Sequence, residues 1–143
     1  MTEPRDTTEP RTPPDPALVL IIEDEEPLAE TIAFMVRAAG HRPLVAFHGR
    51  QGLELARGER PALLIVDLML PHLEGSAIIA ALRADATISG QPAPPSILMT
   101  AANLPRARAA CADVVLLKPF QLADLETLLR RFLGPSALSR GEW

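Results

Sequence analysis

Four short apolar runs in this 143-residue chain each lead into side chains with charged or reactive chemistry. In chain order, those side chains are Glu23 and Asp24, then Asp67, Thr100 and Lys118. Apolar runs of this length, separated by helix-like segments, indicate buried parallel strands. Because the carboxyl ends of parallel strands line one crevice of an open α/β sheet, we expect three acids, a hydroxyl and an amine to meet there.

This group of side chains has a definite chemistry. Glu23, Asp24 and Asp67 would place up to three negative charges close together, which is costly unless a cation neutralises them. Carboxylates without His or Cys favour Mg²⁺ over zinc, and protein-bound Mg²⁺ usually keeps waters and takes phosphate oxygens. Asp67 could then act as a nucleophile, with Lys118 and Thr100 binding the phosphoryl oxygens. The residues therefore indicate phosphoryl transfer to a carboxylate.

The segments that must position these residues alternate between strand and helix patterns. Besides the four strands that precede the reactive residues, the pattern predicts a short strand at 43–47. Helices are expected over 27–39, over 49–57 with Gly58 as the stop, from Gly75 onward, over 104–111 for about two turns, and over 121–133. Residues 87–95 are expected to form a polar, proline-rich loop. Five βα units result.

Composition limits the possible classes of protein. The chain is 48% hydrophobic and 22% charged, as in globular proteins, and its net charge of −4 gives no basic footprint for nucleic acid. No apolar run is long enough to span a bilayer, and the N-terminus lacks the apolar core of a secretory signal. With Cys111 as the sole cysteine, no internal disulfide can form, and we expect a cytoplasmic protein. We expect a proline-rich disordered arm at 1–16, one domain at 17–134 and a loosely ordered tail at 135–143.

Four motifs together resemble the receiver domain of two-component response regulators. They are Glu23-Asp24, Asp67-Leu-Met-Leu-Pro71 with Gly75, Thr100-Ala101, and Lys118-Pro119-Phe120. The resemblance covers roughly residues 18–133 and implies a doubly wound parallel sheet of order 2-1-3-4-5 flanked by five helices. Because only residues 134–143 follow it, we expect a stand-alone receiver rather than one with a DNA-binding domain.

The resemblance also implies a role for each matching residue. Asp67 would accept phosphate from a histidine kinase or a histidine phosphotransfer protein. Glu23, Asp24 and Asp67, with the backbone carbonyl of Met69, would hold Mg²⁺. Thr100 would be the switch hydroxyl and Lys118 the cation that contacts the phosphate, with a cis Lys118–Pro119 peptide bond. Apart from self-dephosphorylation, such a domain is not an enzyme, and its output would be protein–protein binding as a monomer or homodimer.

The chain departs from the family pattern in ways that concern output. Val115 stands where many receivers carry a Tyr or Phe that moves inward with the threonine. The interval from Thr100 to Lys118 is short and contains Pro105, so we expect the fourth helix to be short or displaced. The first acid, Glu23, is a Glu rather than an Asp.

Other interpretations of the same residues remain open at this point. The chain could be a degenerate receiver that acts as a phosphorylation-independent docking module. A metal-dependent phosphohydrolase would also use Asp67, but it would need a general acid–base that the sequence does not show. Individually, Asp67 could be a helix cap and Thr100 could satisfy a turn.

Overall fold

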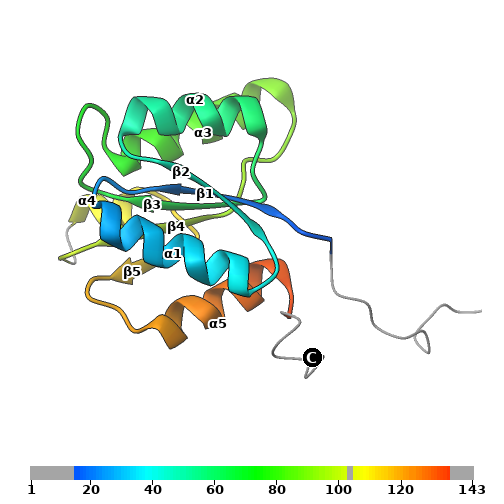
Figure 1. The fold of residues 1–143 in the computed structure, drawn as a ribbon. Helices are drawn as coiled ribbons and strands as arrows, with labels where there is room; N and C mark the ends of the chain where they lie inside the picture. Colours follow the sequence, from blue (N-terminus) through cyan, green and yellow to red (C-terminus); the bar gives the residue numbers. More distant parts are fainter. Residues whose placement is uncertain (1–14, 103–104, 136–143) are drawn as a thin grey trace, which may run out of the picture.

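A computed structural model describes residues 15–102 and 105–135 of the chain. Figure 1 shows a sheet of five parallel strands between two layers of helices. The strands are β1 Leu18–Ile22, β2 Arg42–Ala46, β3 Leu63–Asp67, β4 Ser96–Thr100 and β5 Val114–Leu117. The helices are α1 Glu26–Ala38, α2 Gly49–Glu59, α3 Gly75–Ser89, α4 Pro105–Ala109 and α5 Leu122–Leu133. The sheet order β2-β1-β3-β4-β5 confirms the predicted doubly wound topology.

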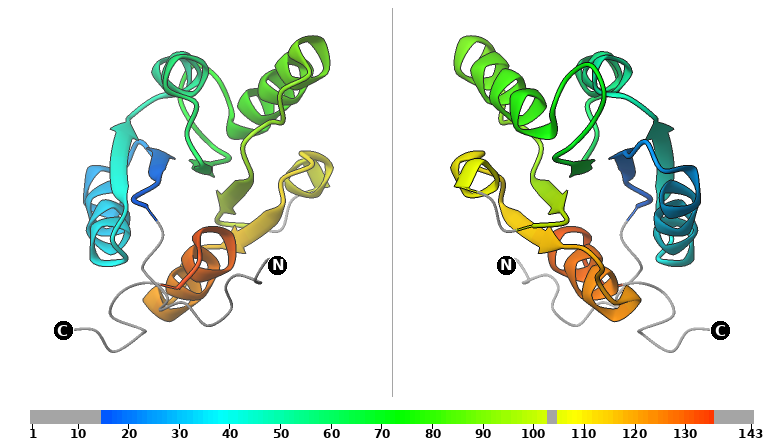
Figure 2. Two further views of the ribbon diagram at one scale, coloured as in Figure 1. Left: turned by 90° about the vertical axis from the view of Figure 1, so that its right-hand side faces the viewer. Right: turned by 90° about the vertical axis from the view of Figure 1, so that its left-hand side faces the viewer.

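Alternating side chains of the central strands pack into two separate hydrophobic cores, one on each face of the sheet. In β1, Leu20 and Ile22 pack with residues of α2, α3 and α4, whereas Val19 and Ile21 pack with residues of α1 and α5. The two helical layers are seen on opposite sides of the sheet in Figure 2. Burial on both faces explains why these strands read as continuous apolar runs.

The register of the strands brings the predicted reactive residues to one edge. Ile22 lies beside Val66, and Asp67 lies beside Met99, so Glu23 and Asp24 begin where β3 ends. Thr100 lies beside Leu117, which places Lys118 directly beyond it. The carboxyl ends of β1, β3, β4 and β5 therefore converge as expected.

The ends of several helices differ from the sequence predictions; α4, for example, ends at Ala109 rather than at residue 111. The α2 helix does not stop at Gly58 but continues to Glu59, and Arg60 takes the left-handed conformation with φ of 50°. The α3 helix extends through residues 87–89, which the sequence predicts as loop, and ends at Gly90 with φ of 79°. In both cases the last residues of the helix are exposed, so no packing contact opposes the helical conformation. The Thr87 hydroxyl donates to the Arg83 carbonyl and is thereby satisfied within the helix.

The segment between β4 and β5 is short, as predicted. The α4 helix contains five residues, and its Ala107 is buried against the α2–α3 core. The Lys118–Pro119 peptide bond is cis, which confirms the sequence expectation. The predicted arm at 1–16 and tail at 135–143 fall almost entirely outside the described residues, so those boundaries stay predictions. Among the described residues, no helix has the length and apolar character to cross a membrane.

Candidate functional site

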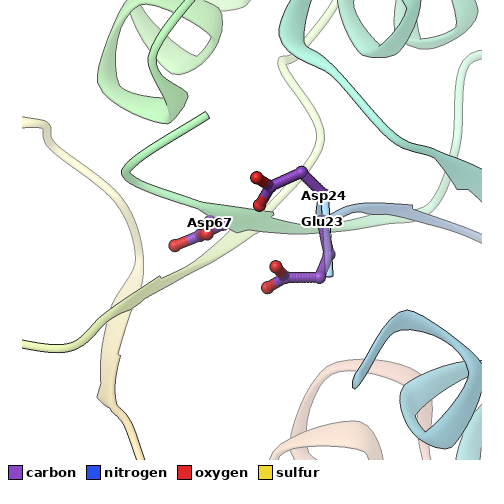
Figure 3. Close-up of side chains that lie close together, drawn as sticks. All are labelled: Glu23, Asp24 and Asp67. Atoms are coloured by element: carbon purple, nitrogen blue, oxygen red, sulfur yellow. The ribbon is translucent and has the colours of Figure 1, made fainter. Parts of the chain in front are cut away.

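Three carboxylates gather at the carboxyl edge of the sheet. Glu23 and Asp24 follow β1, Asp67 ends β3, and each offers an oxygen within 4.8 Å of the others. Figure 3 shows the three side chains projecting into the same space from neighbouring strands. Glu23 and Asp67 are buried, and Asp24 is exposed. The sequence prediction that these acids meet is therefore confirmed.

Glu23 is fixed by two hydrogen bonds. Its Oε2 accepts from the Glu25 backbone N–H at 3.0 Å, and its Oε1 accepts from Lys118 Nζ at 3.0 Å. Burial raises the pKa of Glu23, although these two donors pull it in the opposite direction. A buried acid with both oxygens engaged is well suited to orient a neighbouring cation.

Asp67 is held at the end of β3 by its neighbours. Burial raises the pKa of Asp67, while the Lys118 ammonium group and the Met69 backbone N–H favour its charged form. Close packing also fixes the backbone here, because the Gly75 N–H donates to the Leu68 carbonyl at 2.9 Å. A Cβ at Gly75 would collide with the Asp67 carbonyl oxygen, so α3 can begin only with glycine at this distance from the acid.

Lys118 reaches into the acidic group from the end of β5. Its Nζ lies 3.0 Å from Glu23 Oε1 and 3.4 Å from Asp67 Oδ2. Burial alone would lower the pKa of Lys118, but the hydrogen bond from Lys118 to Glu23 and the charge of Asp67 outweigh it and raise that pKa. The lysine therefore stays charged and presents a fixed cation beside the Asp67 carboxylate.

Thr100 is at the same edge but does not bond to the acids. Its buried hydroxyl donates to the Ala102 carbonyl at 2.8 Å, and its oxygen accepts from the Ala102 N–H at 3.3 Å. Both bonds satisfy the loop after β4, as the turn interpretation of the sequence predicts. A role at the site would require this hydroxyl to exchange its partner.

Sequence reasoning missed one side chain at the rim of the site. Arg106 of α4 lies against Met69 and Glu74, both in the segment between β3 and α3. Its Nη2 donates to Met69 Sδ at 2.9 Å, and its Nη1 lies 3.7 Å from Glu74 Oε2. No spacing rule links residues 37 positions apart in different elements, so the sequence held no usable pattern for this contact.

The donor set at this edge suits a hard divalent cation. When ionised, three carboxylates and one ammonium group leave two net negative charges in a largely buried space. All the side-chain donors are carboxylate oxygens, which favour Mg²⁺ over softer metals. Burial raises the pKa of both Glu23 and Asp67, and a bound divalent cation would favour the charged form of each carboxylate. The residues present therefore fit Mg²⁺.

Comparison with known proteins agrees with this geometry. The sequence model of the response regulator receiver domain family matches residues 19–130. The transcriptional activator PfeR of Pseudomonas aeruginosa is 37% identical over 126 residues, which cover 82% of this chain and 39% of PfeR. This chain spans about half the length, or less, of the curated relatives it matches.

Solved structures show the same fold. The receiver domain of the sensor histidine kinase PA1611 from Pseudomonas aeruginosa, with a magnesium ion coordinated in its active-site cleft, is 29% identical. The TM-score is 0.73, and the match covers 83% of this chain and 98% of that domain. The receiver domain of Ssk1 from Saccharomyces cerevisiae, crystallised with the histidine phosphotransfer protein Ypd1, is 21% identical with a TM-score of 0.77. That match covers 86% of this chain and 92% of the other, and it supports the fold alone.

The matched segment includes β1 from Val19 onward, the other four sheet strands and every residue of the acidic group. Such domains are signalling modules of two-component systems rather than classical enzymes. The chain therefore belongs to the response regulator receiver domain family.

Proposed function

We propose that this protein is a phospho-accepting receiver in a two-component or phosphorelay pathway, with Asp67 as the phosphorylation site. The observation that carries the proposal is the position of the Asp67 carboxylate. It stands at the end of a buried strand, beside Glu23 and Asp24, and 3.4 Å from the Lys118 ammonium group. A nucleophile, acidic metal ligands and a fixed cation are the groups that phosphoryl transfer to a carboxylate requires.

In the proposed reaction, a carboxylate oxygen of Asp67 attacks the phosphorus atom of the donor. A bond forms between that oxygen and phosphorus as the bond from phosphorus to the donor breaks. With a phosphohistidine donor, the electron pair leaves on the imidazole nitrogen, and with acetyl phosphate it leaves on acetate. The product is an acyl phosphate at Asp67. Lys118 is placed to stabilise the negative charge on the phosphoryl oxygens throughout.

The metal ligands in this proposal are Asp24, Asp67 and the backbone carbonyl of Met69, with Glu23 as a further acid that holds the cation. When bound, Mg²⁺ would neutralise the acids and bind phosphoryl oxygens. Glu23 already orients Lys118 through a 3.0 Å hydrogen bond, so its carboxylate serves both cations. Supporting residues of this kind typically change metal affinity by about 10- to 100-fold when they are replaced.

Thr100 is proposed as the conformational switch. A phosphoryl group on Asp67 offers a charged acceptor that competes with the Ala102 carbonyl for the Thr100 hydroxyl. Exchange of that partner would move the loop after β4. Val115 occupies the site of the usual aromatic partner and is half-buried, so movement of this loop would have to carry the signal without it.

We propose a histidine kinase or a histidine phosphotransfer protein as the phosphodonor, and protein–protein binding as the output. The receiver domain of Ssk1, which has the same fold, is crystallised with the histidine phosphotransfer protein Ypd1, and our proposal extends this kind of partner to the present chain by analogy. We also propose the cytoplasm as the compartment, since the reaction uses Mg²⁺ and the sole cysteine, Cys111, is free. The net charge of −4 does not favour direct contact of this domain with DNA.

The test is incubation with Mg²⁺ and acetyl phosphate, followed by measurement of intact mass. We expect one added phosphoryl group in the native protein and none in Asp67→Asn or in the presence of EDTA. Asp85→Asn is the matched control, because Asp85 is an acid on α3 that pairs with Arg57 away from the site. A folded protein that takes no phosphate from acetyl phosphate or from a histidine phosphodonor would instead favour the phosphorylation-independent docking module.

A further inference from the structure

Arg106 stands at the rim of the acidic site without belonging to the motifs that define it. It is carried by α4, whose five residues lie between the switch threonine and β5. Its contacts with Met69 and Glu74 both join it to the segment that follows Asp67. The arginine therefore joins α4 to the loop of the phosphorylation site.

Met69 brings the arginine close to the acid. Met69 follows Asp67 by two positions, its backbone N–H favours the charged form of the Asp67 carboxylate and so lowers its pKa, and its Sδ accepts from Arg106 Nη2 at 2.9 Å. The residue that contacts the guanidinium group thus lies two positions after the proposed phosphoacceptor. A phosphoryl group on Asp67 would extend the negative charge outward from the buried carboxylate toward this rim.

The present partners of Arg106 are weak. A thioether sulfur is a poor hydrogen-bond acceptor, and the 3.7 Å pair with Glu74 is half-exposed on the arginine side. The other Glu74 oxygen already accepts from the Ser76 hydroxyl at 3.2 Å. By contrast, phosphate groups carry nearly two negative charges and bind guanidinium through paired, charge-assisted hydrogen bonds. A phosphoryl group would therefore compete well for Arg106.

We propose that Arg106 is a phosphate-responsive positioning residue. On phosphorylation of Asp67, its side chain breaks its contacts with Glu74 and Met69 and pairs with the phosphoryl group. Because α4 carries Arg106 and packs only Ala107 into the core, the helix moves with the arginine. This exchange gives α4 a direct link to phosphorylation in a chain that has Val115 in place of an aromatic switch residue. The proposal rests on the proposed function, since it requires Asp67 to accept phosphate.

The experiment uses beryllium fluoride with Mg²⁺ as a stable substitute for the phosphoryl group, and NMR titration of backbone amides gives the apparent affinity. We expect Arg106→Gln to weaken beryllium fluoride binding about tenfold, equivalent to about 1.4 kcal/mol. We expect Glu74→Gln to strengthen binding, because it removes the group that competes for the arginine. Arg108→Gln is the matched control on the same helix, and it should stay within about twofold, since Arg108 is bonded to neither Met69 nor Glu74 in the described structure.

A double-mutant cycle separates this exchange from a general effect of charge. If Glu74 acts by competing for Arg106, Glu74→Gln should have no effect on affinity in the Arg106→Gln protein. An equal gain in both backgrounds would mean that only the negative charge of Glu74 matters, and would overturn the proposal. If Arg106 merely braces α4, Arg106→Gln and Glu74→Gln should change affinity in the same direction, which would also overturn it.

Measurements on the native protein show whether the role of Arg106 alone is wrong or whether the proposed function is wrong as well. Phosphorylation of the native protein by acetyl phosphate, with unchanged beryllium fluoride affinity in Arg106→Gln, would overturn the role of Arg106 alone. Absence of both phosphorylation and beryllium fluoride binding in the native protein would overturn the function and the inference together. Thermal unfolding of each variant confirms that the comparison is made between folded proteins.

Discussion

The Lys118 ammonium group lies 3.0 Å from the Glu23 carboxylate, although the two residues are 95 positions apart in the chain. The same ammonium group is 3.4 Å from Asp67, so Glu23 holds it beside the proposed phosphoacceptor. A lysine with one buried partner is restricted in orientation and needs little rearrangement to meet a phosphoryl group. Such preorganisation of charge is the main source of stabilisation in reactions of this type.

Lys118→Gln should separate catalysis of phosphoryl transfer from metal binding. The rate of phosphorylation by acetyl phosphate should fall by about 10²- to 10³-fold, because a charged donor to the transition state is lost. The affinity for Mg²⁺ should stay the same or rise, since the ammonium group no longer competes for the acids. Stopped-flow fluorescence or mass spectrometry gives the rate, and calorimetry gives the metal affinity. A parallel loss of rate and metal affinity would show that Lys118 only maintains the fold of the site.

Asp67→Asn should stabilise the metal-free protein. Burial raises the pKa of Asp67 in the folded state, so above its ordinary pKa the folded state binds more protons than the unfolded state. The free energy of unfolding then falls as pH rises through that window, because its slope follows the protons bound by the unfolded state minus those bound by the folded state. In EDTA near pH 7.5, the variant should be more stable by on the order of 1 kcal/mol, a typical size for one substitution.

The effects of pH and Mg²⁺ on the stability difference between Asp67→Asn and the native protein test its cause. The gain in Asp67→Asn should disappear below the ordinary pKa of aspartate, where the carboxyl group is protonated in both states. Saturating Mg²⁺ should reverse the order of stability, because it binds the folded native protein more tightly than the variant. Urea unfolding at several pH values measures both effects. If the native protein were more stable than Asp67→Asn in EDTA, burial of the charged Asp67 carboxylate would not be the source of the stability difference, and the prediction would be wrong.

His41 should make stability depend on pH below neutrality. Burial lowers the pKa of His41, and its Nδ1 accepts a hydrogen bond from the Ala17 N–H at 3.0 Å. The ordinary pKa of histidine is about 6.5, and His41 keeps this pKa in the unfolded state. As pH falls through this value, the unfolded state takes up a proton before the folded state does, so the free energy of unfolding decreases. Full stability is present above that value and is lost as pH falls through the lowered pKa of the folded state.

Replacement of His41 isolates this contribution. His41→Gln retains an oxygen acceptor for the Ala17 N–H but does not titrate, so its stability should change less between pH 7.5 and pH 5 than that of the native protein. His72→Gln is the control, because His72 is exposed in the loop after β3. Chemical unfolding at the two pH values measures the slopes. Equal slopes in the native protein and His41→Gln would show that another group is responsible.

Thr100→Ala should accept phosphate but fail to transmit it. The hydroxyl is bonded to Ala102, so its loss should alter the rate of phosphorylation by less than about tenfold while suppressing amide shift changes at residues 105–118. Thr100→Ser retains the hydroxyl and should behave as the native protein does. Amide spectra before and after phosphorylation give the comparison. Unchanged spectra of this segment in the phosphorylated native protein would contradict the switch model.

The sequence predicts the strands and the acidic site well for a physical reason. Strands buried on both faces must be apolar throughout, so the residue after each run, such as Asp67, marks the sheet edge. Helix ends are harder, because Gly58 and Thr87 lie at exposed helical positions where neither packing nor strain decides the conformation. The contact of Arg106 with Met69 depends on how α4 sits over the β3–α3 segment, and no local pattern encodes that distance.

The central claim is that phosphate is transferred to Asp67 itself, and chemical trapping tests it most directly. Protein treated with acetyl phosphate and Mg²⁺ is reduced with borohydride, which converts an aspartyl phosphate to homoserine, and the digested peptides are sequenced by mass spectrometry. We predict homoserine at residue 67 and at no other acid, dependent on both Mg²⁺ and the phosphodonor. Homoserine at Asp24 or another acid with residue 67 unchanged, or no homoserine in folded protein, would contradict the assignment of Asp67 as the phosphorylation site.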